Sequence, residues 1–336
     1  MRLSATGVGS LPGDDAAAFD EALRVVLGTF DDFPHLPELP GRGAQANMVG
    51  RALAVVAELG ADLQPAGWRL TGAAPGIDQR RARSLLAQDL DALEEQTQGY
   101  DGRLKIQVAG PWTLAATVER PKGDRLLADH GARRELAQAL AEGLRQHVAD
   151  VRRRVPAASL VVQLDEPALP AVLAGTVPTA SGFHRHRSVD NPEASPALEW
   201  AMAAVAESGA TPVVHCCAAD VPFGLLTGTG AQGVSVDLSA LGAPSYDALA
   251  ELLESGRTVM LGVVPTTEPG DPSRPDDSAV TERVQRLLDM LGLDPADEAL
   301  GDLVITPSCG LAGASAAWAR QACELSERVA RNLASG

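Results

Sequence analysis

Aromatic side chains are scarce in this sequence, since Phe, Trp and Tyr make up only 3% of its 336 residues. Little material is therefore present for a nucleic-acid surface on which bases stack. Basic residues are also in the minority, with 28 Lys and Arg against 44 Asp and Glu and a formal net charge of −16. Such a charge repels phosphate backbones and anionic lipid surfaces. We therefore expect neither a nucleic acid nor a membrane as a partner.

Long apolar runs and a dense set of cysteines are missing as well. No run approaches the ~20 apolar residues of a membrane span, and the opening MRLSATGVGSLPGDD has no charged-then-apolar signal pattern. Four cysteines are too few for a disulfide scaffold in a chain of this length. We expect a cytoplasmic protein, in which clustered Cys and His indicate metal or redox chemistry.

Short runs rich in Val, Ile and Leu alternate with longer amphipathic segments throughout the chain. The runs predict strands near 3–9, 61–66, 104–109, 159–165, 211–216, 233–238, 257–263 and 302–306. Eight strand–helix units in ~300 residues favour an α/β protein with a single (β/α)8 TIM barrel. A doubly wound sheet is the alternative, but no G-x-G-x-x-G follows the first strand. We expect residues 1–336 to form one catalytic-type barrel domain.

The helices between these strands are predicted from apolar spacing. Within 131–155, apolar residues recur every three or four positions and form one stripe. Further helices are expected over 44–59 and 314–332. In a barrel of this kind, chemistry lies at the carboxyl ends of the strands. We therefore expect the following residues to gather on one rim: Gly9, Ser10, Gln64, Gly110, Asp165, Glu166, His215, Cys217, Asp237, Gly262 and Cys309.

The stretch VVHCCAAD, residues 213–220, carries the strongest chemical signal. Alternate residues of a strand point the same way, so His215 and Cys217 can share a target while Cys216 faces away. Imidazole and thiolate suit zinc, and a carboxylate can complete the set. Asp237 and Cys309 also end strands, so His215, Cys217, Asp237 and Cys309 form a candidate four-ligand zinc site. The alternative is that these cysteines are small buried apolar residues, which is how we interpret Cys216 and Cys323.

Two adjacent carboxylates end the strand in QLDEPAL, residues 163–169. Asp165 and Glu166 could cap the following helix. At a barrel mouth they could equally bind an ammonium group or move a proton. The sequence leaves both interpretations open. The basic stretch FHRHRS, residues 183–188, is similarly ambiguous: it could receive an anion, or its charges could pair with the acidic surface.

The segments TGVGSLPG, AGPWTL, QLDEPAL, VVHCC and ITPSCGL follow one another over residues 6 to about 312. In this order they resemble the catalytic C-terminal barrel of cobalamin-independent methionine synthase and, more loosely, the uroporphyrinogen decarboxylase-like superfamily. The resemblance implies a cytoplasmic zinc enzyme of methionine biosynthesis that transfers a methyl group to a thiol such as homocysteine. It places zinc on His215, Cys217 and Cys309, with Asp237 at the position of a glutamate ligand.

The resemblance also implies substrate contacts and shows departures from the family pattern. Val8, Gly9 and Ser10 match the turn that holds homocysteine, and Asp165 matches its partner aspartate. Arg42 stands where a carboxylate that grips the substrate amino group is expected. Pro265 and Thr267 stand where the family has an aspartate and a histidine that acts as an acid. Thr117 stands where the family has a tryptophan. We expect no N-terminal duplicate barrel like that of the long enzymes.

These departures argue against methyltetrahydrofolate as the methyl donor. A corrinoid protein or a small methyl compound is the alternative donor, in a related zinc–thiol methyltransferase. A degenerate, non-catalytic barrel with a structural metal is the non-enzyme alternative. Decarboxylation of a porphyrinogen is disfavoured, because that chemistry needs no zinc ligands and its anionic substrate would favour a more basic mouth.

Overall fold

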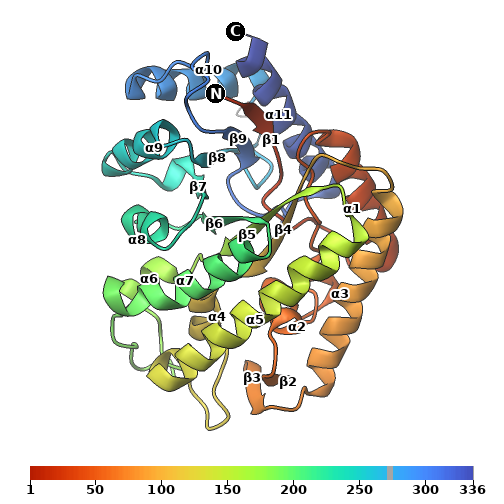
Figure 1. The fold of residues 1–336 in the computed structure, drawn as a ribbon, viewed down its shortest axis with the longest axis vertical. Helices are drawn as coiled ribbons and strands as arrows, with labels where there is room; N and C mark the ends of the chain where they lie inside the picture. The colour runs from red at the N-terminus through yellow and green to blue at the C-terminus, as the bar shows by residue number, and fades with distance from the viewer. Residues whose placement is uncertain (271–274, 336) are drawn as a thin grey trace.

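A curled sheet of seven parallel strands forms the centre of the molecule, with the helices around it (Figure 1). The computed structural model describes residues 1–270 and 275–335. The order of the strands in the sheet is β1-β9-β8-β7-β6-β5-β4. Their bounds are β1 Leu3–Ala5, β4 Arg103–Ala109, β5 Ser159–Asp165, β6 Thr211–Cys216, β7 Gly233–Asp237, β8 Thr258–Val264 and β9 Leu303–Pro307.

The helices follow the strands as crossover connections, which parallel pairing requires. They are α1 Ala16–Thr29, α2 Met48–Val55, α3 Ile77–Gln96, α4 Pro111–Thr117, α5 His130–Arg154, α6 Leu169–Leu173, α7 Asn191–Glu207, α8 Phe223–Gly228, α9 Pro244–Glu254, α10 Asp277–Leu291 and α11 Ala316–Ser335. The predicted stripe on α5, formed by Leu136, Leu140, Leu144, Val148 and Val151, is buried in the main core. No helix in the described ranges is both long and apolar enough to span a membrane.

The predicted second strand does not join the central sheet. Residues Gly60–Gln64 form β2, which pairs antiparallel with β3, Gly67–Gly72, in a hairpin at the bottom of Figure 1. The turn consists of Pro65 and Ala66 alone, because Gln64 pairs directly with Gly67. So short a turn can join only antiparallel strands. Gln64 therefore lies in this hairpin and not on the rim where we had placed it.

An extended segment, residues 34–38, takes the place between the two edge strands of the sheet. Its His35 bridges to Lys105 of β4, and its Glu38 bridges to Ser10 just after β1. Four backbone hydrogen bonds of 2.8–3.1 Å hold the segment on both sides. Pro34 and Pro37 have no N–H to donate, so the segment cannot form a regular ladder. The α/β class and the curled parallel sheet are confirmed, whereas the described residues form a sheet of seven strands and not a closed barrel of eight.

The inside of the curled sheet is built in layers by the two-residue alternation of the strands. At the amino ends, the side chains of Phe33, Val161, Val213, Met260 and Val304 pack together as a small apolar cluster, here called the interior plug. Two residues further along β5 comes the polar Gln163, and two residues further again comes Asp165. The same step along β6 leads from Val213 to His215. Polar side chains therefore gather at the carboxyl ends, above the interior plug.

One buried histidine outside this interior should make the fold sensitive to acid. His147 lies in α5, and its burial, together with the nearby Arg51 charge, lowers its pKa from 6.5 to about 4. As the pH falls below 6.5, the unfolded chain therefore takes up the proton before the folded chain does. Between pH 6.5 and 4 this group should remove up to about 3 kcal/mol of stability. In His147→Gln, the fall in unfolding free energy between pH 7 and 4.5, measured by urea titration, should be smaller than in the parent.

His130 provides the matched control, because its side chain is 72% exposed. His130→Gln should follow the parent over the same pH interval. Equal acid destabilisation of the parent and His147→Gln would contradict the prediction.

Candidate functional site

Three of the four predicted metal ligands meet at the carboxyl end of the sheet. One ligand atom from each of His215, Cys217 and Cys309 lies within 4.8 Å of the others. The Sγ atoms of Cys309 and Cys217 are 3.0 Å apart, and the Cys309 Sγ is 3.7 Å from Nε2 of His215. Cys216 points the other way into the main core, as its place in the strand predicts, and burial raises its pKa to about 11.

The imidazole of His215 is oriented by a partner on the neighbouring strand. Its Nδ1 is 2.9 Å from Oγ of Ser235 on β7, the residue paired with it in the sheet. This contact leaves Nε2 directed toward the sulfur atoms. Metal-binding histidines commonly have such a partner on the second ring nitrogen, which fixes the ring orientation. Ser235 is not among the residues predicted from the sequence, although its spacing of two residues from Asp237 places it on the same face of β7.

The two thiols share a hydrogen bond that separates their acidities. The Sγ atoms of Cys217 and Cys309 lie 3.0 Å apart, and this bond, with a further contribution from His215, lowers the pKa of the Cys309 thiol. The pKa of Cys217 is raised by the same bond and by burial. The two sulfur atoms and the imidazole nitrogen are ligand atoms well suited to a thiophilic cation.

Asp237 is not brought into this group. It ends β7 as predicted, but its Oδ1 accepts hydrogen bonds from the backbone N–H and the hydroxyl of Ser239, at 2.8 and 2.7 Å. The carboxylate thereby caps the short turn Leu238–Ala240. A side chain as short as Asp is within easy reach of the backbone two residues on, which explains this local bond. In the described chain, the cluster therefore contains three of the four expected ligands.

A cavity of about 260 Å³ opens beside the three ligands. Val8, Gly9 and Ser10, predicted to bind substrate, line it together with Asp165. The turn after β1 is held close to the cysteine loop, since Leu311 donates to the Ser10 carbonyl at 2.7 Å. A Cβ atom on Gly310 would lie 2.0 Å from Oγ of Ser10, so a larger residue there would displace the Ser10 hydroxyl. The complete lining is Val8, Gly9, Ser10, Glu38, Pro40, Met48, Gln107, Asp165, Pro167, His215, Cys217, Cys309 and Gly310.

The adjacent carboxylates of β5 face different surroundings. Asp165 faces the cavity, where its Oδ1 accepts a 2.7 Å hydrogen bond from Gln163, and burial raises its pKa. Glu166 instead accepts from the backbone N–H groups of Trp112 and Thr113 and from the Thr113 hydroxyl, at 2.7–2.9 Å. These groups belong to the first turn of α4. Glu166 therefore caps α4, which precedes it in the chain, whereas the capping role that the sequence left open concerned the helix that follows.

Arg42 does not take the place of a substrate-binding carboxylate. Its guanidinium forms two hydrogen bonds with Asp89 of α3, at 2.7 and 2.8 Å. Arg51 also binds Asp89, and its Nε lies 3.1 Å from Oε1 of Glu38. Glu38 in turn lines the cavity. A buried carboxylate that the sequence analysis did not single out is thus present in the site.

The basic stretch 183–188 forms a hairpin-like loop between α6 and α7. His186 is buried, and its Nε2 lies 3.3 Å from a carboxylate oxygen of Asp124. His184, Arg185 and Arg187 are exposed. The contact with Asp124 favours the ion-pair interpretation over an anion site.

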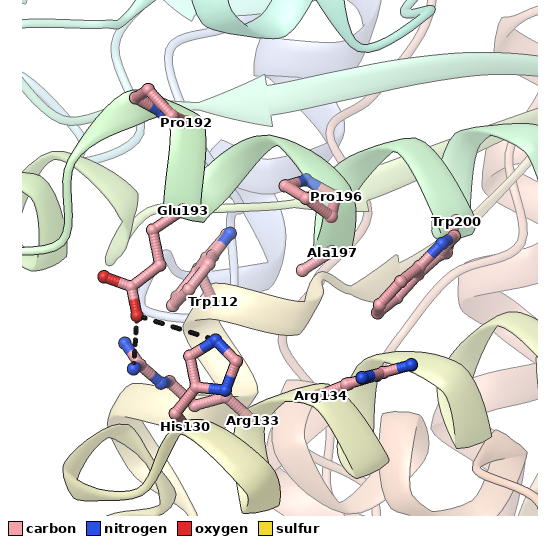
Figure 2. A pocket seen from close by; sticks show the side chains of 9 residues that line it. All are labelled: Trp112, His130, Arg133, Arg134, Pro192, Glu193, Pro196, Ala197 and Trp200. Carbon is pink, nitrogen blue, oxygen red and sulfur yellow. Dashed lines mark hydrogen bonds and ion pairs between the residues drawn. The ribbon is translucent and has the colours of Figure 1, made fainter.

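A second hollow, of about 290 Å³, lies on the outside between α5 and α7, with Trp112 of α4 at its base (Figure 2). Its Glu193 forms an ion pair with Arg133, at 2.7 Å, and its carboxylate lies 4.0 Å from Nε2 of His130. No cysteine lines it, and its charged groups are largely paired with one another. The cavity at the carboxyl ends of the strands is therefore the candidate active site.

Comparison with known proteins identifies a family. Residues 102–332 match the family described as the catalytic domain of cobalamin-independent synthase. The chain belongs to this family. The matched region includes His215, Cys217 and Cys309, whereas Val8–Ser10 and Glu38 precede it. No curated protein sequence matches the chain.

A solved structure of a B12-independent methionine synthase shares the fold. A B12-independent methionine synthase from Shewanella sp. W3-18-1, in complex with selenomethionine, aligns with a TM-score of 0.65 at 15% identity, over 100% of this chain and 98% of that one. A β-mannanase from the blue mussel Mytilus edulis aligns with a TM-score of 0.46 at 11% identity, over 97% and 91% of the two chains.

The capping position of Glu166 predicts a variant that loses stability and keeps its ligand site. Glu166→Gln replaces one acceptor oxygen with an NH₂ group that faces the N–H donors of α4. We expect a loss of about 1–3 kcal/mol in unfolding free energy, measured by urea titration. Thr113→Val, which removes only the hydroxyl donor, should cost less. An unchanged unfolding midpoint together with lost thiol binding would instead place Glu166 in the chemistry.

Proposed function

We propose that this chain is a zinc-dependent methyltransferase that transfers a methyl group to a thiol such as homocysteine. The observation that carries the proposal is the meeting of one imidazole and two thiols beside a cavity lined by carboxylates. Membership of the cobalamin-independent synthase family supports it. The similar fold of a B12-independent methionine synthase, which is described in complex with selenomethionine, supports an amino-acid ligand containing sulfur or its analogue.

The donor set fits zinc. Two sulfur atoms and one ring nitrogen converge, and Ser235 fixes the remaining ring nitrogen. Three protein ligands and one exchangeable position are typical of catalytic zinc sites, whereas structural sites are closed by four. We propose His215, Cys217 and Cys309 as the ligands, with Asp237 as a fourth if its bonds to Ser239 open. Bound zinc would supply Lewis acidity that keeps a substrate thiol deprotonated at neutral pH.

The remaining residues of the cavity would bind and orient the acceptor. We propose that Val8, Gly9 and Ser10 form one wall against the substrate, and that Asp165 binds its ammonium group. In the reaction, the bond between the acceptor sulfur and the methyl carbon forms as the bond between that carbon and the donor breaks. We further propose that residues 1–336 act as one barrel of the (β/α)8 type, since Val8–Ser10 and Glu38 lie outside the region that matches the family and yet line the cavity.

Metal content tests the ligand assignment. The purified protein should bind about one zinc ion per chain, and Cys217→Ser or Cys309→Ser should lose most of it. Cys216→Ser is the matched control and should keep its zinc, because Cys216 faces the core. Ser235→Ala should lower zinc affinity by roughly 10- to 100-fold. The measurement is elemental analysis and competition with a chelator under reducing conditions, because the two sulfur atoms lie 3.0 Å apart. Equal loss from all three cysteine variants would refute the assignment.

The methyl donor is tested separately. Turnover of homocysteine with methyltetrahydrofolate should be weak, because Pro265 and Thr267 stand where the family has Asp and an acidic His. Thr117, at the position of the family's tryptophan, donates its hydroxyl back to the Thr113 carbonyl at 2.7 Å. A positioned general acid contributes roughly 10²–10⁴-fold, and a poor leaving group depends on it. Zinc-loaded protein should form methionine faster with a methylcorrinoid or sulfonium donor. Robust turnover with methyltetrahydrofolate would show that other residues supply the acid.

A further inference from the structure

The second hollow, on the outside between α5 and α7, gathers aromatic rings in a chain that has few of them. Two of the four tryptophans, Trp112 and Trp200, line it. Pro192, Pro196 and Ala197 add to its apolar walls. Its volume of about 290 Å³ lies at the lower end of the range for small-molecule pockets. The hollow therefore suits a ligand of one or two planar rings, which pack well against indole.

The hollow is open because a small residue lies between two large ones on α7. Glu193, Ala197 and Trp200 are spaced by four and three residues, so they lie on one face of the helix. The side chain of Ala197 ends at Cβ and leaves the space between its two neighbours unfilled. Trp112 is fixed at the base, since its Nε1 donates to the Ala194 carbonyl at 3.1 Å. The walls are therefore in place before a ligand binds, which lowers the entropic cost of binding.

The charges of the hollow are paired at one end and unpaired at the other (Figure 2). Glu193 pairs with Arg133 at 2.7 Å, and His130 lies on the same side. At the other end, Arg134 contacts no carboxylate among the described residues. Its guanidinium carbon lies 6.0 Å from the centre of the Trp200 ring. A cation without a counter-ion thus stands beside an aromatic face.

The start of α5 adds to this positive charge. The helix begins at His130, so Arg133 and Arg134 lie in its first two turns, and its first turn has no acidic residue. The N-terminus of a helix carries a partial positive charge, which disfavours cations and favours anions. The cap residue Asp129 has a partner of its own in Arg120, at 3.7 Å. The hollow is therefore a local site for an anion on a chain whose net charge is −16.

We propose that this hollow binds a small planar aromatic anion. The ring lies over Ala197 against the indole of Trp200, and the acid group binds the guanidinium of Arg134. Guanidinium groups bind carboxylate or phosphate through two parallel hydrogen bonds, which gives the contact its specificity. The site goes beyond the proposed methyl transfer and is separate from it, because the linings of the two cavities share no residue.

The test uses 2-naphthoate, which has two fused rings and a carboxylate, and its uncharged counterpart 2-naphthalenemethanol. Calorimetry on the full chain should give a Kd of roughly 1 mM or below for 2-naphthoate, as expected for a ligand of its size. The alcohol should bind at least about 10-fold more weakly, because it lacks the charged hydrogen bond. Arg134→Gln should remove this difference by weakening 2-naphthoate alone. Comparison with 2-naphthyl phosphate shows which acid group the site prefers.

Two further variants locate the bound probe. Ala197→Leu fills the hollow and should abolish the binding of both acids. Arg145→Gln is the matched control, since Arg145 also belongs to α5 but pairs with Glu207 and does not line the hollow. It should keep the affinity of the parent.

Each other outcome overturns the inference. A parent that binds neither acid has no such site. Equal affinity for acid and alcohol, or equal weakening of both by Arg134→Gln, shows that Arg134 does not bind the acid group. Binding that survives Ala197→Leu places the probe elsewhere on the protein. If Ala197→Leu does not fold, Trp200→Leu takes its place: it removes the aromatic face and should weaken both naphthalene probes several-fold.

Discussion

The ammonium group of Lys105 is the point on which the interior of the curled sheet depends. It lies on β4 with no exposed surface, and burial holds its pKa below the ordinary value, while the charges of Asp165 and Glu38 act in the opposite direction. A buried charge is tolerated only when its hydrogen bonds are satisfied. Its three acceptors, at 2.7–3.3 Å, come from the turn after β1, from β4 and from β5. The ammonium thus ties one edge of the sheet to the other.

Two glutamines extend this connection to groups that line the cavity. Gln163 donates to the Val8 carbonyl at 3.0 Å and to Asp165 at 2.7 Å, so the orientation of Asp165 depends on the Lys105 network. Gln107 donates to the Leu36 carbonyl and thereby holds the segment that carries Glu38. Below this polar layer the interior plug excludes water. The cavity has a floor that is polar and already hydrogen-bonded, which is the condition for fixed side-chain positions in a binding site.

Neighbouring residues in the sequence take separate tasks because the strand directs them to opposite sides. Asp165 faces the cavity, whereas Glu166 accepts three hydrogen bonds from α4. Gly110 allows this cap, since a Cβ atom there would lie 2.4 Å from Oε1 of Glu166. His215 and Cys216 divide in the same way, since His215 joins the cluster with Cys217 and Cys309 and Cys216 joins the core. The alternation of a single strand therefore supplies both the reactive groups and the packing that supports them.

The sequence by itself determined what depends on short-range periodicity and strand ends. Runs of Val, Ile and Leu located the parallel strands, and the stripe on α5 is buried as expected. The spacing of His215 and Cys217 predicted which cysteine faces the site, and the order of the motifs indicated the family. Each of these features is encoded within a few neighbouring residues, so the chain carries it locally.

Only the tertiary structure decided the features that depend on long-range competition for hydrogen bonds. Asp237 ends its strand as predicted, yet its carboxylate accepts two hydrogen bonds from Ser239 and does not join the cluster of His215, Cys217 and Cys309. The strand expected over 61–66 pairs with its own hairpin partner, and the proline-rich segment 34–38, which has no strand pattern, lies between β1 and β4 instead. Glu38 lines the cavity because segment 34–38, and not the strand expected over 61–66, lies between β1 and β4. No local pattern distinguishes such a carboxylate from a surface one, because its burial is set by β1 and β4, which lie far from it in the chain.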